Sequence, residues 1–173
     1  EGLWQQRRFD AWAPLPLHEP VIHVNWHEAQ AYCRYAGRRL PSEAEWEMAV
    51  SCAGTPAKRT FPWGDAPPDA RRANLEGSAP VAVDALPAGA SPQGCRQLLG
   101  NTWEWTDTAF GPYPGFEPDP YSEYSQPWFG THKVLRGGSF ATPARLIRNT
   151  WRNFYTPERY DIFAGFRTCA IET

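Results

Sequence analysis

Apolar residues recur at helical spacing in two short segments of the chain. The first segment opens at Asn25, a favourable N-cap, with Glu28 three positions later as its capping-box partner, and it ends at Gly37. This pattern predicts a helix over residues 26–36.

The second helical segment, SEAEWEMAV, follows Pro41. Ser42 and Glu45 form another capping box, and the apolar periodicity continues until Gly54. We predict a helix over residues 43–52.

Alternating polar and apolar residues predict strands in the second half of the chain. In GNTWEWTDTAF the two tryptophans alternate with Thr and Glu, which is typical of a strand with one face toward water. The pattern of KVLRGGSF indicates a strand that ends at a glycine pair, and FAGFRTCAI indicates a core strand. Val81 and Val83 allow at most a short strand.

Loops occupy much of the remaining sequence. The chain has 18 Pro and 14 Gly, which limit long regular elements, and 9 Trp, which supply large buried areas. Residues 55–92 are punctuated by FPWGD, APPD and LPAG and are mostly loop. Residues 111–130 form a loop rich in Pro and aromatic side chains, and long ordered loops usually carry function. We therefore expect low helix and strand content.

Length, charge and cysteine content restrict the function classes. The 173 residues suit a single domain, 1–173, and the net charge of -2 offers no basic face for nucleic acid. No apolar run approaches the length of a membrane span, and no signal peptide opens the chain. The four Cys lack CxxC spacing, which favours free buried thiols in a reducing, cytoplasmic compartment. Because the chain starts at Glu1 without Met, we expect it to be part of a longer polypeptide.

Two histidines four residues apart, His23 and His27, raise the question of a metal site. Two imidazoles at this spacing on one helix can share an ion. The Asn25 cap, however, leaves His23 in extended chain before the helix, so the two side chains do not share a helical face. A structural role is therefore favoured for both, and His18 and His132 are isolated in the sequence.

Five motifs occur in order along the chain: RRLPSEAEWEMA, FPWGD, GNTWEWT, VLRGGSF and AGFRTC. Together they resemble the formylglycine-generating-enzyme (sulfatase-modifying factor) domain family over nearly the whole chain. The resemblance implies an irregular α+β fold related to C-type lectins, with two helices, a small twisted antiparallel sheet and many loops.

One departure from that family bears on activity. Its copper-dependent members bind Cu(I) with two Cys after the GGS motif, and the matching positions in this chain are Thr142 and Ile147. Neither side chain can replace a thiolate, which disfavours a copper-dependent formylglycine-generating oxidase. That oxidase and a non-catalytic lectin-like binding module are the two alternatives to the following interpretation.

Two segments, PYPGFEPDPYSEYSQPWFG and RNTWRNFYTPERYDIFAGFR, look like the C-terminal domain of ergothioneine-type sulfoxide synthases and selenoneine synthases. In those enzymes an N-terminal four-helix domain holds a non-haem Fe(II) with three His. The substrate hercynine is joined at its imidazole C2 to sulfur or selenium with O2. The resemblance implies that this chain is the C-terminal part of such an enzyme. Its iron would come from the missing N-terminal domain, since the pattern HxxxHxE is absent and Ala29 stands where the acid should be.

The resemblance also assigns site residues. It matches Tyr121 to the family's catalytic tyrosine, which delivers a proton near the iron, and Tyr124 to a neighbouring active-site tyrosine. Asn153 and Phe154 match positions that line the hercynine pocket, where aromatic faces would hold the trimethylammonium group. Tyr155 stands where one branch has an Asp that binds the ammonium of γ-glutamylcysteine, so cysteine or a selenosugar is the expected donor. The alternative is that the tyrosines pack a Pro-rich loop and that Asn153 satisfies loop backbone.

Other polar residues allow more than one interpretation. Some relatives bind Ca2+ in a region that matches four residues of this chain: Asn74, Leu75, Asn101 and Glu104. Oxygen ligands suit that ion. Five arginines could bind an anionic substrate, although structural ion pairs are favoured for them: Arg136, Arg145, Arg148, Arg152 and Arg167.

Overall fold

The computed structural model describes residues 4–51, 59–121 and 123–171. Helix α1 (Trp26–Tyr35) begins at the predicted capping box. The Asn25 Oδ1 accepts from the backbone N–H of Glu28 at 2.9 Å, and Glu28 Oε2 accepts from the N–H of Asn25 at 2.8 Å. The helix ends one residue before its predicted end, because Gly37 follows in the left-handed region at φ +63°.

Helix α2 (Glu43–Ser51) also begins at its predicted capping box. The Ser42 Oγ accepts from the N–H of Glu45 at 3.2 Å, and Glu45 Oε2 accepts from the N–H of Ser42 at 2.7 Å. Residue 52, the predicted last residue of this helix, lies outside the described residues.

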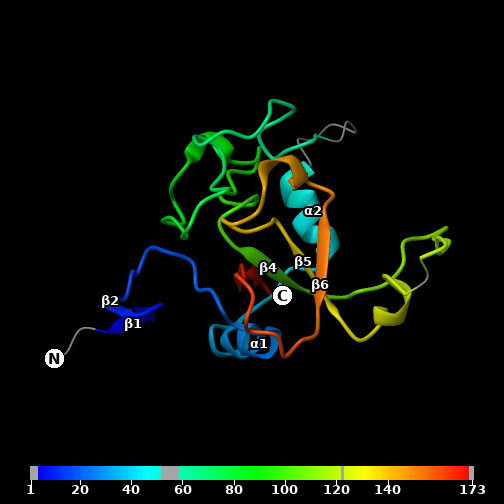
Figure 1. Ribbon diagram of the computed structural model, residues 1–173, viewed down its shortest axis with the longest axis horizontal. Helices are drawn as coiled ribbons and strands as arrows, with labels where there is room; N and C mark the ends of the chain where they lie inside the picture. The colour runs from blue at the N-terminus through cyan, green and yellow to red at the C-terminus, as the bar shows by residue number, and fades with distance from the viewer. Residues whose placement is uncertain (1–3, 52–58, 122, 172–173) are drawn as a thin grey trace.

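A four-stranded sheet lies between the two helices (Figure 1), and its strand order is β6-β5-β4-β7. Its antiparallel strands are β4 (Trp103–Ala109), β5 (Lys133–Arg136) and β6 (Arg152–Tyr155), and β7 (Ala164–Gly165) pairs with β4 in parallel. Strand β5 ends at the predicted glycine pair. Gly137 has φ +95°, and a Cβ there would lie 2.6 Å from the Leu98 carbonyl oxygen, so this turn requires glycine.

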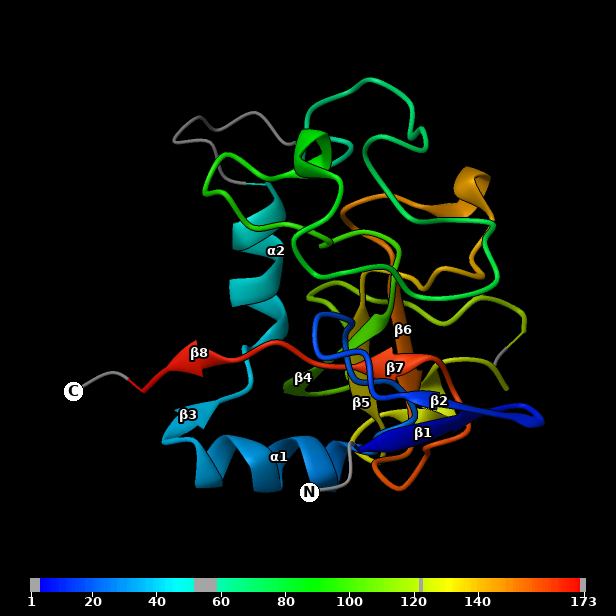
Figure 2. The ribbon, with the colours of Figure 1, turned by 90° about the vertical axis from the view of Figure 1, so that its left-hand side faces the viewer.

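Two further strand pairs flank the sheet (Figure 2). An N-terminal hairpin pairs β1 (Gln5–Arg8) with β2 (Ala11–Pro14), and β3 (Arg38–Arg39) pairs with β8 (Cys169–Ala170). The predicted core strand FAGFRTCAI is therefore wrong as one element, because β7 and β8 join different sheets. Val81 lies in no strand, and its backbone bonds instead to the Asn101 side chain.

Both faces of β4 are buried over residues 103–106, which corrects the prediction of one face toward water for this part of the strand, whereas Asp107 and Ala109 are exposed. Trp105 on one face and Glu104 and Thr106 on the other are almost inaccessible to solvent. The reason is that a hydrophobic core lies on each side of the sheet, one beneath each helix. The α1-side core comprises Ala29, Cys33, Leu40, Trp103, Trp105, Leu135 and Ala164. The α2-side core comprises Trp46, Val50, Phe61, Leu98, Leu99 and Ile147.

The cysteines that the structure describes are free thiols, as predicted, but the predicted burial is confirmed for only one of these three. Cys33 is buried, whereas Cys95 and Cys169 are partly exposed, and Cys52 lies outside the described residues. Among those residues, neither helix has the length and apolar run that a membrane crossing requires.

Candidate functional site

The predicted site residues divide between the two faces of the sheet at its edge strand, β6. Side chains of a strand alternate between faces, so Phe154 lies opposite to Asn153 and Tyr155. Phe154 pairs with Val134, and Asn153 pairs with Leu135 of the α1-side core. Phe154 therefore faces the α2 side of the sheet, and its two neighbours face the α1 side.

Phe154 belongs to a group of aromatic rings, here termed the aromatic cluster: Phe110, Tyr121, Tyr124, His132 and Phe154. The ring of Phe154 stacks on that of Phe110, with centroids 3.9 Å apart and planes inclined by 11°. The Tyr124 ring lies 5.8 Å from Phe154 and 6.4 Å from the nearly parallel ring of Tyr121. The cluster thus connects the predicted catalytic tyrosine with two of the predicted substrate-binding residues.

The loop 111–130 holds the two tyrosines at the surface. Its ends are closed by backbone hydrogen bonds from Gly130 N–H to Phe110 O (2.8 Å) and from Phe110 N–H to His132 O (2.7 Å). Asp119 Oδ1 accepts from the N–H of Tyr121 at 2.8 Å. Tyr121 and Tyr124 are 65% and 61% exposed as residues, so a ligand or another domain can reach them.

His132, which appears isolated in the sequence, is a member of the aromatic cluster. Its ring meets Phe154 edge-on at 5.7 Å and Trp128 at 5.2 Å, and Nδ1 lies 2.9 Å from the Thr131 hydroxyl. Burial lowers the pKa of His132. Sequence reasoning missed this residue because it enters the cluster through the pairing of β5 with β6, which no local motif encodes.

Asn153 and Tyr155 do not reach the aromatic cluster. The Asn153 Oδ1 accepts from the N–H of Phe154 at 2.9 Å, a local contact. Tyr155 packs against the α1-side core, and the guanidinium of Arg159 lies 4.8 Å from its ring centroid. The structure therefore separates these two residues from Tyr121, with which the sequence prediction grouped them.

Buried or partly buried ion pairs account for three of the five candidate arginines, as predicted. Glu43, which is 7% exposed, accepts from Arg136 Nη1 at 2.7 Å and from Arg152 Nη2 at 2.6 Å. Arg167 donates to both carboxylate oxygens of Glu104, each at 2.6 Å. Arg145 and Arg148 are exposed.

The residues matched to a calcium site are only partly together. Asn74 Nδ2 donates to Asn101 Oδ1 at 3.0 Å, and the Asn101 N–H donates to the Asn74 carbonyl at 2.9 Å. Glu104 is engaged elsewhere, by Arg167 and by the Trp46 indole N–H at 2.6 Å, and Leu75 packs against the α2-side core. Glu104 would have to release these partners to bind an ion, and calcium binding stays a prediction.

His23 and His27 do not share a helical face, as the Asn25 cap predicts. His27 is on α1, with Nε2 3.8 Å from a Glu158 oxygen, whereas His23 precedes the helix. His23 is not extended, however: its φ is +61°, and its ring packs against Phe163 at 5.5 Å. Within the described ranges, no group of three or more His, Cys, Asp or Glu is placed to hold a metal ion.

The positions of the copper-binding cysteines are core positions in this chain. Thr142 is buried, and its Oγ1 accepts from the N–H of Ser139 at 2.9 Å. Ile147 belongs to the α2-side core.

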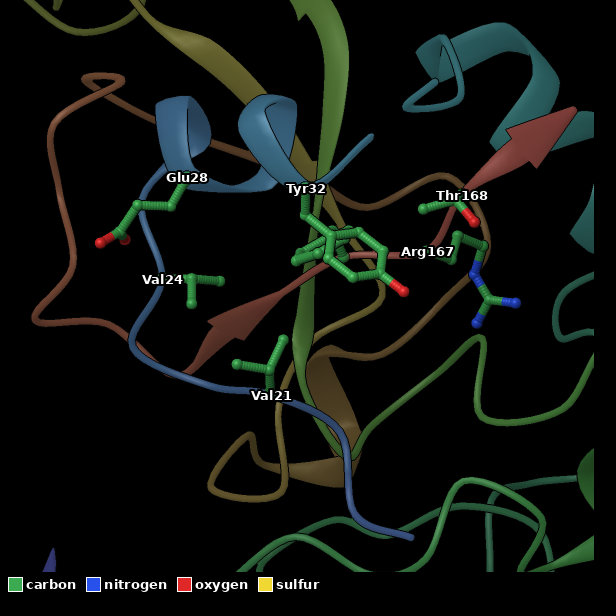
Figure 3. A pocket seen from close by; sticks show the side chains of 7 residues that line it. Val21, Val24, Glu28, Tyr32, Arg167 and Thr168 are labelled. Atoms are coloured by element: carbon green, nitrogen blue, oxygen red, sulfur yellow. The ribbon is translucent and has the colours of Figure 1, made fainter. Parts of the chain in front are cut away.

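A separate hollow of about 560 Å³ lies on the α1 side of the molecule (Figure 3). Val21 and Val24 face the ring of Tyr32 across it, while the guanidinium of Arg167 points away toward one end. The hollow is lined by Val21, Val24, Glu28, Tyr32, Phe166, Arg167 and Thr168, none of which belongs to the aromatic cluster.

Comparison with known proteins places this geometry in a family. Residues 4–172 match the sulfatase-modifying factor enzyme 1-like domain. The hercynine oxygenase of Mycolicibacterium thermoresistibile is 50% identical over 170 residues, covering 92% of this chain and 38% of that protein. The formylglycine-generating enzyme of Mus musculus is 34% identical over 171 residues, covering 88% of this chain and 44% of that protein. The chain therefore spans less than half the length of these relatives.

Solved structures confirm the predicted fold class. PvdO from Pseudomonas aeruginosa aligns with a TM-score of 0.69 at 21% identity, covering 96% of this chain and 70% of that one. The Treponema denticola variable protein 1 aligns with a TM-score of 0.67 at 23% identity, covering 86% and 70%. Because its residues 4–172 match the family model, the chain, which has two helices, small sheets and many loops, belongs to the sulfatase-modifying factor enzyme 1-like domain family.

Proposed function

We propose that this chain is the C-terminal domain of an O2-dependent, non-haem iron enzyme that joins sulfur or selenium to the imidazole C2 of hercynine. The identity to hercynine oxygenases supports the choice of substrate. The proposal extends to a longer polypeptide in which a four-helix N-terminal domain supplies the Fe(II).

The aromatic cluster is the observation that carries the proposal. A trimethylammonium group has no N–H to donate, so it is held by ring faces rather than by hydrogen bonds. Phe154 and Tyr124 offer adjacent rings beside a loop whose ends are closed. This arrangement suits the betaine end of hercynine.

Tyr121 is proposed as the proton donor. Its phenol is exposed and lies beside the rings that would bind the substrate, so it can face a reacting group brought by the N-terminal domain. Iron would supply the O2 chemistry, and this chain would contribute the binding surface and the proton.

Cysteine or a selenosugar is proposed as the sulfur or selenium donor. Tyr155 lies on the face of β6 opposite the aromatic cluster, so this choice is based on the family resemblance, in which an Asp at the matching position binds the ammonium of γ-glutamylcysteine with a negative charge that Tyr155 cannot provide. A cytoplasmic location is also proposed, supported by the free thiols of Cys33, Cys95 and Cys169.

A product assay tests the substrate and the donor together. The complete natural polypeptide, loaded with Fe(II), would be incubated with hercynine and O2 in three parallel reactions containing cysteine, γ-glutamylcysteine or a selenosugar. We expect a C2-substituted product with cysteine or the selenosugar. Mass spectrometry of a sulfatase-motif peptide runs alongside, and formylglycine without any hercynine product would reject the proposal in favour of the copper oxidase.

Replacing Tyr121 with Phe tests the catalytic role. Loss of the hydroxyl removes the proton donor but keeps the ring, so we expect kcat to fall roughly 100-fold while the Kd for hercynine changes less than about 3-fold. Measurement of product formation over time would give kcat, and calorimetric titration would give the Kd for hercynine. An unchanged kcat would contradict the assignment.

A further inference from the structure

The side chain of Arg152 lies beneath the aromatic cluster and links three parts of the fold. Its Nη2 donates to Glu43 of α2 at 2.6 Å, and its Nη1 donates to the carbonyl of Gly111 at 2.9 Å. Gly111 is the first residue of the loop 111–130. The guanidinium thus connects helix α2 with the start of the loop that carries Tyr121 and Tyr124.

The same guanidinium also packs against two ring faces. Its central carbon lies 4.9 Å from the ring centroid of Phe110 and 4.5 Å from that of Tyr113. Phe110 in turn stacks on Phe154 at 3.9 Å. A planar, delocalised cation can stack in this way, whereas the ammonium of Lys cannot cover two rings and donate in two fixed directions at once.

Ion pairing and ring packing together hold this guanidinium in place. The buried Nε of Arg152 has no hydrogen-bond partner within the described part of the chain. Arg167, in the comparable pair with Glu104, instead uses both Nε and Nη2 on one carboxylate. The buried Nε of Arg136, which pairs with the same Glu43, likewise has no partner among the described residues, so this feature is shared by both arginines at that carboxylate.

We propose that Arg152 is a positioning residue of the aromatic site, which fixes the start of the loop 111–130 and the ring of Phe110 against which Phe154 is held. The inference rests on the proposed function, since hercynine is the ligand that the positioned rings would bind. Arg152 acts through Phe110 and Phe154 and does not itself need to touch the substrate.

Kinetics of Arg152→Lys in the complete, Fe(II)-loaded polypeptide test this role. Loss of the stacking plane should raise the KM for hercynine about 10-fold while kcat changes less than about 3-fold. Two control variants distinguish a positioning role of Arg152 from the general effects of replacing an arginine. Arg145→Lys alters an exposed arginine, and Arg167→Lys disturbs a buried pair that lies outside the aromatic cluster; both should leave the KM within about 2-fold of the wild-type value.

A double-mutant cycle with Phe154→Leu then tests the route of the effect. If Arg152 acts through Phe154, Arg152→Lys should raise the KM by less than about 2-fold in the Phe154→Leu background. A full 10-fold rise in both backgrounds, or no rise in either, overturns the positioning role. If Phe154→Leu alone leaves the KM for hercynine unchanged, the proposed function fails instead.

A second variant covers the case in which Arg152→Lys does not fold. Tyr113→Leu removes one ring face from the guanidinium, together with the Tyr113 hydroxyl that lies 3.4 Å from Glu43 Oε1, but keeps the ion pair of Arg152 with Glu43. Tyr113 is 54% exposed, so the fold should tolerate the change. We expect a rise in KM of about 3-fold that disappears in the Phe154→Leu background. A KM equal to that of the wild type would contradict the proposal.

Discussion

The face of β6 on which a side chain lies decides what each residue of RNFY can contact. Phe154 shares its face with the ion pairs of Arg152 and with the rings of the loop 111–130. Asn153 and Tyr155, its immediate neighbours, lie on the face covered by α1. Adjacent positions in a strand therefore serve different purposes, one at the proposed site and two near a hydrophobic core.

Phe154→Leu is the substitution that separates these roles. Leu keeps most of the apolar volume but has no ring face for a quaternary ammonium, so we expect hercynine affinity to fall about 10-fold. Tyr155→Phe, the matched control on the other face, should change the affinity less than about 2-fold. Calorimetric titration of the complete protein with hercynine measures both, and equal losses would mean that the two faces do not act separately.

At the scale of elements, the start of α2 combines a capping box with an ion pair. Arg39 donates from Nη1 and Nη2 to the two carboxylate oxygens of Glu45, at 2.8 and 2.6 Å. These hydrogen bonds, followed by that from the N–H of Ser42, lower the pKa of Glu45 from 4.5 to about 2. The carboxylate thus joins α2 to β3 as well as capping the helix.

The lowered pKa of Glu45 predicts a pH-dependent contribution to stability. A carboxyl group with a folded-state pKa below its unfolded value stabilises the protein above about pH 4.5, and this contribution is lost as the pH falls toward 2. Gln at this position keeps an oxygen for the capping box but loses the charge. Glu45→Gln should therefore lower the Tm at pH 7, and the difference from wild type should shrink with acidification.

Solvent screening of the partly exposed Glu45 carboxylate limits its contribution to stability. The side chain of Glu45 is 37% exposed, so we expect a Tm decrease of at most about 2–4 °C at pH 7. Glu117→Gln, at an exposed loop position, is the control and should not change the Tm. Thermal scans between pH 7 and pH 3 would measure the difference, and a gap between Glu45→Gln and wild type that widens with acid would be incompatible with the lowered pKa.

At the scale of the whole molecule, Arg136 connects parts of the chain that are distant in sequence. It is fully buried, and it donates to Glu43 and Glu47 of α2 and to the carbonyl of Asn149. Its guanidinium also lies 5.0 Å from the ring centroid of Trp46. One side chain on β5 thus holds α2 and the segment that leads to β6 in place.

Arg136→Met should destabilise the whole fold. Removing the cation leaves the buried carboxylate of Glu43 with one partner fewer, and breaking a buried pair in this way costs about 3–5 kcal/mol. Urea denaturation should show this loss in the free energy of unfolding as a single cooperative transition. Arg145→Met, on the surface, should stay within about 0.5 kcal/mol of wild type, and a comparably small change for Arg136→Met would refute the role assigned to the pair.

The sequence by itself determined the features that depend on neighbouring residues. Both capping boxes follow from local geometry, because their hydrogen bonds join residues only three positions apart, and the glycine pair after β5 marks a turn with positive φ. The ordered motifs likewise identified the family. The placement of His23 outside the helix needed nothing more than the Asn25 cap.

Only the tertiary structure decided which side chains meet across the sheet. Glu104 is buried because α2 covers the second face of β4, and alternation of polar and apolar residues cannot report a covering element that lies far away in sequence. The pairing of β5 with β6 and the closure of a long loop bring His132 and Tyr121 into one cluster. The same pairing places Asn153 on the opposite face of the sheet. Long-range pairing is fixed by the packing of the whole chain, so local patterns leave it open.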